Sequence, residues 1–466
     1  MERVAGTLLV AICACIALPA STFAQDGDPC PRPAAGSVVT PPPDLFSENG
    51  VLKVAFDYFT SVDAAGRTLF CFVTPTGKEA PTLHVRPGDR LDLTVGDKVS
   101  PPPAAAPTEI VSNASKQCGD ATMTVSSVNV HFHGTNTSPK CHSDEVIHTI
   151  INSGQSFHYS VQFPADEPPG LYWYHPHIHG IAEAAVQGGA SGAIIVEGIA
   201  KLQPAVAGLP QRVLIIRDQN VAGNPTPGGA IPSWDVTLNY VPIAYPAETP
   251  AIIQMKPGER EFWRVANASA DTILDLQVVY DGVAQPLHVV AFDGVPTGSQ
   301  DGTRRGKIMT QTDILIPPAG RAEFILDGPS AKVKNAVFQT LNIDTGPLGD
   351  NDPTLPLAIV HATPDTPQLQ PESAQESQRP AGPQRFDGLA LVHPTAKRSL
   401  YFSEVVSDPS NPASPTNFFI TVAGATPTLF DPNNPPAITT RQGSVEDWTI
   451  QNQAGDNHEF HMHQIH

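Results

Sequence analysis

The sequence predicts an all-β protein, and two observations carry that prediction. Short runs rich in β-forming residues alternate with turn signals along the chain, which contains 49 Pro and 36 Gly among its 466 residues. No long amphipathic helix pattern interrupts these runs. Short strands separated by frequent turn signals are typical of β-sandwiches. We therefore expect cores that lie between stacked sheets.

The expected strands run from the first hundred residues to past the middle of the chain. They lie at residues 53–60, 83–95, 156–163, 193–197, 212–217, 261–265, 287–292, 312–316 and 321–326. Two changes in composition divide them. Residues 200–211 are a Pro/Ala/Gly stretch between strands, and residues 363–383 are rich in Pro, Gln, Ser and Glu, which is typical of a linker.

These boundaries predict sandwich domains at residues 25–199, 210–362 and 384–466, with a linker at 363–383. The third domain is short for a sandwich. Its last residues, 460–466, stop in the middle of a strand-like pattern without a turn or a polar tail. We therefore expect the third domain to be incomplete in this chain.

Residues 1–24 predict a signal peptide that is absent from the mature protein. Arg3 gives a basic start, residues 8–18 are apolar, and Thr22-Phe23-Ala24 offers a cleavage site before Gln25. An apolar run of this length is too short for a membrane span, which needs about 20 residues, and no later stretch is longer. The sequence thus predicts a secreted or periplasmic protein without a membrane span.

The cysteines agree with export. Cys30, Cys71, Cys118 and Cys141 remain after the signal peptide. An even number of cysteines in an oxidising compartment favours disulfides, here two, for which three pairings are possible. We favour Cys118–Cys141, because it would brace the segment around the first histidine motif. Metal ligation is the weaker alternative, because no two of the four are closely spaced.

The charge of the chain limits its partners. Acidic residues number 46 and basic residues 27, which gives a net charge of −19. Such a charge argues against nucleic acid or an anionic membrane as a partner. It mildly favours cationic or neutral substrates.

Most of the chain's histidines lie in three short windows of the sequence. They lie at residues 129–134, 173–180 and 458–466, and each contains a His-x-His pair. Residues two apart on a strand point to the same face, so each pair can offer two imidazoles to one place. Imidazole suits copper, zinc, iron and nickel. Three pairs supply more ligands than one tetrahedral ion uses and therefore predict a metal cluster, rather than surface or hydrogen-bonded core histidines.

Together the windows resemble the multicopper oxidases, the family of laccases, ascorbate oxidase, bilirubin oxidase and bacterial cuprous oxidases. His131-Phe132-His133-Gly134 matches the family's first motif, Trp173-Tyr174-His175-Pro176-His177 its second, and the His-x-x-His-x-His run from His458 to His463 its third. Residues 262–267 and 316–324 extend the resemblance into the middle of the chain. The resemblance implies three cupredoxin-like Greek-key β-sandwich domains, the third incomplete here.

The resemblance also implies copper ligands. The family's motifs assign the type 2 copper to His131 and His461. They assign the type 3 pair to four further histidines, His133, His175, His177 and His463. His458 would be a ligand of the type 1 copper, on the opposite strand face from His461, whereas His179 and His466 match no ligand position.

Asp144 is the candidate catalytic residue. It stands where the family carries an acidic residue between its first two motifs, near the trinuclear cluster and implicated in proton delivery. Reduction of dioxygen to water consumes protons, so a buried acid beside the cluster would have a function. A solvated turn residue is the alternative at this position.

The family's fourth motif, a His-Cys-His that completes the type 1 and type 3 sites, does not occur, because no cysteine follows Cys141. We expect either that the chain continues beyond His466 or that it is a truncated product without oxidase turnover. The expected function is a copper-dependent oxidase that couples one-electron oxidation of phenols, aromatic amines or metal ions to reduction of dioxygen to water. The scattered methionines slightly favour a laccase-like phenol oxidase.

Two other functions compete with this hypothesis. The first is a copper-binding or copper-storage protein without oxidase turnover, which would bind copper but consume no dioxygen. The second is a zinc hydrolase, which is disfavoured because no carboxylate joins the histidines in a His-x-x-x-His type motif.

Overall fold

The computed structural model describes residues 27–464 except 104–105, 107, 111–117, 222–230, 300–305, 367, 373–385, 387 and 409–415. The predicted signal peptide lies outside these residues. The prediction of an all-β fold is confirmed, because the described residues form thirty strands and one short α-helix, α1 (Ala182–Gln187). The three 3-10 turns are η1 (Ile199–Lys201), η2 (Pro204–Val206) and η3 (Leu389–Leu391).

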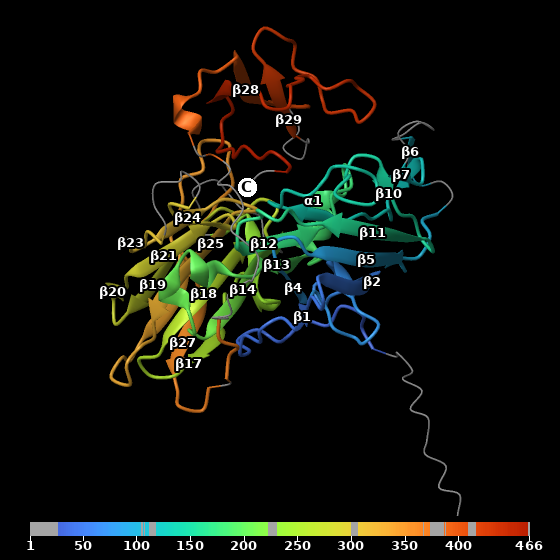
Figure 1. The fold of residues 1–466 in the computed structure, drawn as a ribbon. Coiled ribbons are helices and arrows are strands. Elements are labelled where there is room, and N and C mark those ends of the chain that lie inside the picture. The colour runs from blue at the N-terminus through green and yellow to red at the C-terminus, as the bar shows by residue number, and fades with distance from the viewer. Residues whose placement is uncertain are drawn as a thin grey trace, which may run out of the picture.

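The first group of strands forms a sandwich of a five-stranded sheet, in the order β1-β4-β13-β12-β9, and a four-stranded sheet, in the order β11-β5-β2-β3 (Figure 1). The strands are β1 (Asp44–Phe46), β2 (Val51–Val62), β3 (Thr68–Val73), β4 (Thr82–Val85), β5 (Arg90–Asp97), β9 (His131–His133), β11 (Ser156–Gln162), β12 (Gly170–His175) and β13 (Gly192–Val196). Two small pairs lie beside the sandwich, β6 (Thr108–Ile110) with β8 (Thr122–Thr124) and β7 (Cys118–Gly119) with β10 (Thr149–Ile150).

Side chains of both sheets fill the core of this first sandwich. Residues of β11 alternate strictly between exposed and buried, as expected for a strand with one face on the core and one in water. The strand expected at 83–95 is in fact two strands, β4 and β5. Pro87 and Gly88 cause the break, because they form a turn that closes with the bond from Asp89 N to Arg86 O (2.9 Å).

The second group is a larger sandwich. Its eight-stranded sheet has the order β16-β15-β14-β18-β25-β21-β22 with β23 on β21, and its six-stranded sheet the order β17-β27-β26-β19-β20 with β24 on β19. The strands are β14 (Gln211–Asn220), β15 (Trp234–Leu238), β16 (Val241–Ile243), β17 (Ala251–Met255), β18 (Arg260–Asn267), β19 (Leu274–Tyr280), β20 (Val283–Ala284), β21 (Leu287–Phe292), β22 (Val295–Pro296), β23 (Met309–Gln311), β24 (Ile314–Ile316), β25 (Arg321–Asp327), β26 (Ala336–Thr340) and β27 (Leu355–Ala362).

The third group is a single sheet within the described residues. It has the order β29-β28-β30, with β28 (Ala396–Val406) between β29 (Thr416–Val422) and β30 (Glu446–Asn452), and lies apart from the sandwiches in Figure 1. Few of its apolar side chains are buried, and Phe418 and Ile420 are 54% and 59% exposed. We propose that the three groups correspond to domains 25–199, 210–362 and 384–466.

Two segments make contacts outside their own group of strands, the N-terminal segment and the segment predicted to be a linker. Val38 pairs with Ile252, and Val39 lies in the core of the second sandwich rather than the first. In the segment predicted to be a linker, Pro371 pairs with Pro210, and the buried Glu372 carboxylate lies 2.6 Å from the Arg264 guanidinium. The N-terminal segment and the segment predicted to be a linker thus both contact the second sandwich.

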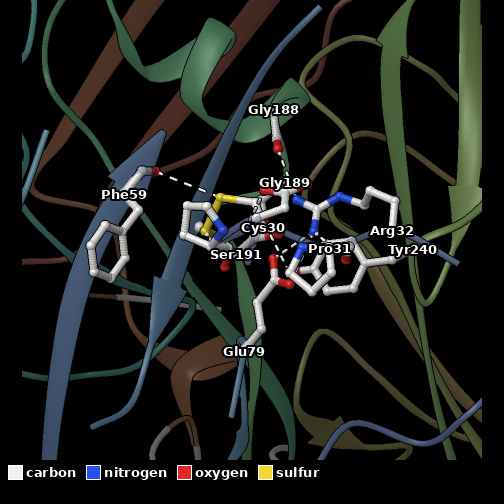
Figure 2. Close-up of polar contacts among 12 residues, drawn as sticks. Cys30, Pro31, Arg32, Phe59, Glu79, Gly188, Gly189, Ser191 and Tyr240 are labelled. Atoms are coloured by element: carbon white, nitrogen blue, oxygen red, sulfur yellow. Dashed lines mark hydrogen bonds and ion pairs between the residues drawn. A yellow bond between two sulfur atoms is a disulfide. The ribbon is translucent and has the colours of Figure 1, made fainter. Parts of the chain in front are cut away.

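A second polar cluster joins the first two sandwiches. Figure 2 shows Arg32 between the Glu79 carboxylate (2.7 Å) and the Gly188 carbonyl (3.3 Å), beside the ring of Tyr240. The guanidinium carbons of Arg32 and Arg217 lie 4.2 and 4.1 Å from the centre of that ring. Stacked cation–π contacts of this kind are favourable when they are shielded from water.

The prediction of two disulfides is confirmed. They join Cys118 to Cys141, the favoured pair, and Cys30 to Cys71. Among the described residues, no helix is long and apolar enough to cross a bilayer.

Candidate metal centre

Two adjacent strands of the first sandwich carry three of the predicted ligands, His131, His133 and His175. In the antiparallel pair β9–β12, His131 lies opposite His175 and His133 lies opposite Trp173. Because side chains alternate along a strand, these four share one face, whereas Phe132 and Tyr174 between them point into the core. The indole of Trp173 stacks on the His175 ring at 4.1 Å, which restricts the orientation of that imidazole.

Asn129 positions His177, the fourth predicted ligand. Its side-chain oxygen accepts a hydrogen bond from the backbone N–H of His177 (2.7 Å), and its Nδ2 donates to the carbonyls of Val146 and Thr149 (3.0 and 3.3 Å). The His177 ring then lies 5.3 Å from that of His131. Asn129 was not recognised as a site residue from the sequence, although it stands two positions before His131.

The segment after β30 brings two more histidines to this face. The His463 ring stacks on His131 and the His461 ring on His133, each with centroids 4.1 Å apart. Ligand atoms of His131, His133 and His461 all lie within 4.8 Å of one another. Residues more than 300 positions apart therefore form one cluster of six imidazoles.

Hydrogen bonds at Nδ1 orient two rings of this cluster. Nδ1 of His131 lies 2.9 Å from Asp144 Oδ1, and Nδ1 of His175 lies 2.8 Å from the Pro176 carbonyl. These bonds leave Nε2 of each ring for another partner, and within the described part of the chain Nε2 of His131 is buried without any hydrogen-bond partner. Second-sphere bonds of this kind fix the orientation of metal-ligating histidines.

The electrostatics of the cluster keep the imidazoles neutral. Burial, aided by repulsion from neighbouring histidines, holds the pKa values of His131, His133 and His175 well below the usual range, and Arg321 adds to this at His131 and His133. Burial and neighbouring histidines also lower the pKa values of His461 and His463 to about 4, with a contribution from Arg321 at His461. Metal ions bind the neutral imidazole, so the donor set fits copper, zinc or a similar ion.

Asp144 lies against this cluster and is buried, not solvated. Its Oδ1 accepts a hydrogen bond from the backbone N–H of Phe132 (3.0 Å). Burial raises the pKa of Asp144 to about 7, against the lowering effect of that bond. A carboxyl with this pKa can take up and release a proton near neutral pH.

The first histidine motif ends with Gly134, and the structure shows why a glycine stands at this position. Its φ is +81°, and an added Cβ would lie 2.2 Å from Nη2 of Arg321. Arg321 is buried and donates from Nη2 to the Asp293 carbonyl (2.9 Å). The glycine therefore leaves room for a cation beside the cluster, and sequence reasoning did not assign this role to Arg321.

His458 lies outside the six-imidazole cluster. Its Nε2 is 2.7 Å from Asp456 Oδ1, and its ring lies 5.0 Å from that of Phe402 in β28. Beside it is a cavity of about 820 Å³. The cavity wall includes acidic and aromatic side chains, among them Asp271, Asp350, Asp352, Phe402, Phe418 and Phe430. His179 contacts Phe430 instead of the cluster, and His466 lies outside the described residues.

Known proteins share this sequence segment and this fold. The sequence model of the multicopper oxidase family matches residues 123–201, which include both histidine pairs of the first sandwich. A comparison with curated protein sequences found no match.

The solved structures that resemble the chain are multicopper oxidases. A metallo-oxidase from Campylobacter jejuni is 18% identical, with a TM-score of 0.59 over 92% of this chain and 81% of that one. The laccase-like multicopper oxidase CueO from Ochrobactrum sp. is 17% identical, with a TM-score of 0.57 over 89% of this chain and 82% of that one. A variant of the multicopper oxidase McoA from Aquifex aeolicus is 14% identical, with a TM-score of 0.55 over 82% and 74%. The chain thus matches the multicopper oxidase family model at residues 123–201 and has the fold of solved multicopper oxidases over most of its length.

Proposed function

We propose that the chain binds a trinuclear copper cluster through its six converging histidines and acts as a copper-dependent oxidase. The observation that carries this proposal is the cluster itself, in which imidazoles from β9, from β12 and its end, and from the segment after β30 lie around Nε2 of His131, a buried atom without a hydrogen-bond partner among the described residues. Buried polar atoms normally have partners, and a metal ion bound by these imidazoles would supply one for this nitrogen. Imidazole donors in this number favour copper over magnesium or calcium, which prefer oxygen ligands.

The roles of the individual histidines follow the family motifs. His131 and His461 would hold the type 2 copper, and the remaining four cluster histidines would hold the type 3 pair. The nitrogen separation of 3.4 Å between His175 Nε2 and His133 Nδ1 supports a shared ion. Two ligands at about 2.0 Å from one tetrahedral ion lie about 3.3 Å apart.

Copper, when bound, supplies one-electron redox chemistry and with it the reduction of dioxygen to water. The chain's own residues hold and orient the ligands and provide protons. Asp144 would hold a proton at its carboxyl group beside His131, and its pKa of about 7 supports exchange of that proton at neutral pH. The buried Arg321 would balance negative charge that develops near His133.

The reducing substrate would be a phenol, an aromatic amine or a low-valent metal ion. Two of the solved relatives are described as a metallo-oxidase and as a laccase-like oxidase active on lignin model compounds. The cavity beside His458 supports a small substrate, because acidic side chains would attract a cation and aromatic ones would stack on a ring. His458 is the proposed type 1 ligand, because its place in the third histidine motif matches that ligand in the family.

Two disulfides support a secreted or periplasmic location, because disulfides persist in oxidising compartments. A copper-binding or copper-storage protein without turnover is the competing function.

Copper binding and dioxygen consumption distinguish these functions. The purified chain would be loaded with copper, its metal content determined, and dioxygen uptake followed with a phenol, an aromatic diamine and Cu(I) in turn. We expect the double variant His131→Ala/His133→Ala to lose most of the bound copper. The control is His158→Ala, which changes an exposed histidine on β11 and should bind copper as the unmodified chain does.

Each outcome has a clear meaning. Copper binding together with dioxygen uptake supports the oxidase, and copper binding without uptake supports storage. If the double variant binds as much copper as His158→Ala, the six histidines are not the copper site and the proposal fails.

A further inference from the structure

A loop of the second sandwich contacts the segment that leads into His458, His461 and His463. The loop, residues 344–348, lies between β26 and β27. The backbone N–H of Asn457 donates to the Thr345 carbonyl (2.9 Å), and the N–H of Leu348 donates to the Gly455 carbonyl (3.1 Å). Nδ2 of Asn457 also donates to the Asp344 carbonyl (3.1 Å). These three bonds end one residue before His458.

Two glycines allow the backbones to approach so closely. Gly346 has φ +102°, and a Cβ there would lie 2.5 Å from the Gly455 carbonyl oxygen and 3.2 Å from the Asp456 Cα. A Cβ at Gly455 would lie 2.7 Å from Cδ1 of Leu348. Real Cβ atoms do not approach backbone atoms to 2.5 Å, so any other residue at Gly346 would push the two segments apart.

The loop itself is held firmly by the second sandwich. Asp350 Oδ2 accepts a hydrogen bond from the Trp234 indole (2.7 Å), and the Asn351 N–H donates to Ser233 Oγ (2.7 Å). Ile343 pairs with Asp352, and Thr345 bonds the Asp350 carbonyl across the loop. The contact therefore joins the third sheet to a rigid platform rather than to a free loop.

The position of this contact determines where the last histidines can lie. His461 follows Asn457 by four residues, which at roughly 3.5 Å per residue reach at most about 14 Å. The third sheet by itself has no other backbone hydrogen bond to the second sandwich among the described residues. We propose that the glycine pair Gly346–Gly455 is a positioning element that presents His461 and His463 to the histidines of the first sandwich.

This inference rests on the proposed copper centre, and the variant Gly346→Ala tests it. We expect the variant to fold, to keep the first-sandwich histidines, and to bind copper about tenfold or more weakly in competition with a chelator. Its bound Cu(II) should give the electron paramagnetic resonance spectrum of a His461→Ala/His463→Ala double variant, because the same two nitrogens are withdrawn. A purely structural role would lower stability without changing that spectrum.

The matched control is Gly282→Ala in the turn between β19 and β20. Gly282 has φ +83°, so alanine meets the same backbone strain there, but a Cβ has nothing within 4 Å. Its copper affinity and spectrum should equal those of the unmodified chain. If Gly346→Ala does not fold, Asn457→Ala, which removes only the bond to the Asp344 carbonyl, should show the same spectral change in part.

The outcomes separate the two proposals. An unmodified chain that binds no copper overturns the copper centre, whatever the variants do. Copper binding by the unmodified chain, with an affinity and spectrum in Gly346→Ala that match those of Gly282→Ala, overturns the positioning role alone. If Gly346→Ala does not fold, an unchanged spectrum in Asn457→Ala overturns it equally.

Discussion

At the scale of single residues, the protein buries carboxylates that are only partly satisfied. Asp97 at the end of β5 has no exposed surface. Its Oδ1 accepts a hydrogen bond from the Val99 N–H (2.8 Å), whereas Oδ2 has no partner within the described structure. Burial raises the pKa of Asp97 to about 6, despite that bond and the nearby Lys98.

The raised pKa of Asp97 makes stability depend on pH. Below about pH 4 the Asp97 carboxyl is protonated in both the folded and the unfolded protein, so it does not change the free energy of unfolding. Between pH 4 and 6 the unfolded chain loses the proton first, so the free energy of unfolding falls, and above pH 6 the whole penalty is present. We expect the stability of Asp97→Asn, relative to the unmodified chain, to rise by about 2 kcal/mol between pH 4 and pH 8.

Urea unfolding of both proteins at the two pH values measures this difference. Any constant effect of the asparagine side chain cancels, because only the change with pH is compared. A difference that stays the same at both pH values would mean that Asp97 ionises normally in the folded protein.

At the scale of elements, the segment between β7 and β10 carries the first histidine pair and Asp144. The disulfide from Cys118 to Cys141 closes this segment, with a sequence separation of 23 residues. Asp144 follows Cys141 by three residues and is held by the bond from its N–H to the Ser138 carbonyl (2.8 Å). The disulfide therefore restrains the loop that places Asp144 against His131.

Removal of this disulfide should affect both stability and the metal centre. In the chain-entropy description, opening a loop of this length costs about 3 kcal/mol of folding free energy. We expect Cys118→Ser/Cys141→Ser to lose about that much in urea unfolding and also to bind copper more weakly. The control Cys30→Ser/Cys71→Ser, with a separation of 41 residues, should lose similar stability but keep its copper affinity. Equal copper affinity in both variants would contradict the restraint on the Asp144 loop.

At the scale of the whole molecule, Tyr240 connects the first two sandwiches. The ring lies between two guanidinium groups, and the hydroxyl donates to the Gly189 carbonyl (2.9 Å). Arg217 in turn donates from Nε to Ser191 Oγ (2.7 Å). Loss of the ring would leave two buried or half-buried cations facing each other across a cavity. Both the cavity and the burial of charges that have lost a partner would destabilise the folded protein.

We expect Tyr240→Ala to uncouple the sandwiches. Its unfolding free energy should fall by about 3 kcal/mol, the low end of the usual range for deletion of an aromatic ring, because Tyr240 is only partly buried. Tyr240→Phe keeps the ring and loses one hydrogen bond, so it should lose only about 1 kcal/mol. Thermal unfolding followed by calorimetry compares the three proteins. Equal losses for both variants would mean that the hydroxyl, and not the stacked ring, makes the connection.

What the sequence by itself determined was local. The all-β fold followed from turn residues and short β-rich runs. The shared face of His131 and His133 followed from the two-residue period of a strand. Each of these properties depends on neighbouring residues only, so no tertiary information was needed.

Only the tertiary structure decided how the distant parts meet. The stacking of His461 on His133, the buried Arg321 beside Gly134, and the docking of Glu372 on Arg264 join residues that are far apart in the chain. The family resemblance implied that the histidines converge, but no local pattern indicated Asn129, Arg321 or the Gly346–Gly455 contact. The physical reason is that such contacts depend on side-chain packing and on empty space for a missing Cβ, and neither has a period or a spacing in the sequence.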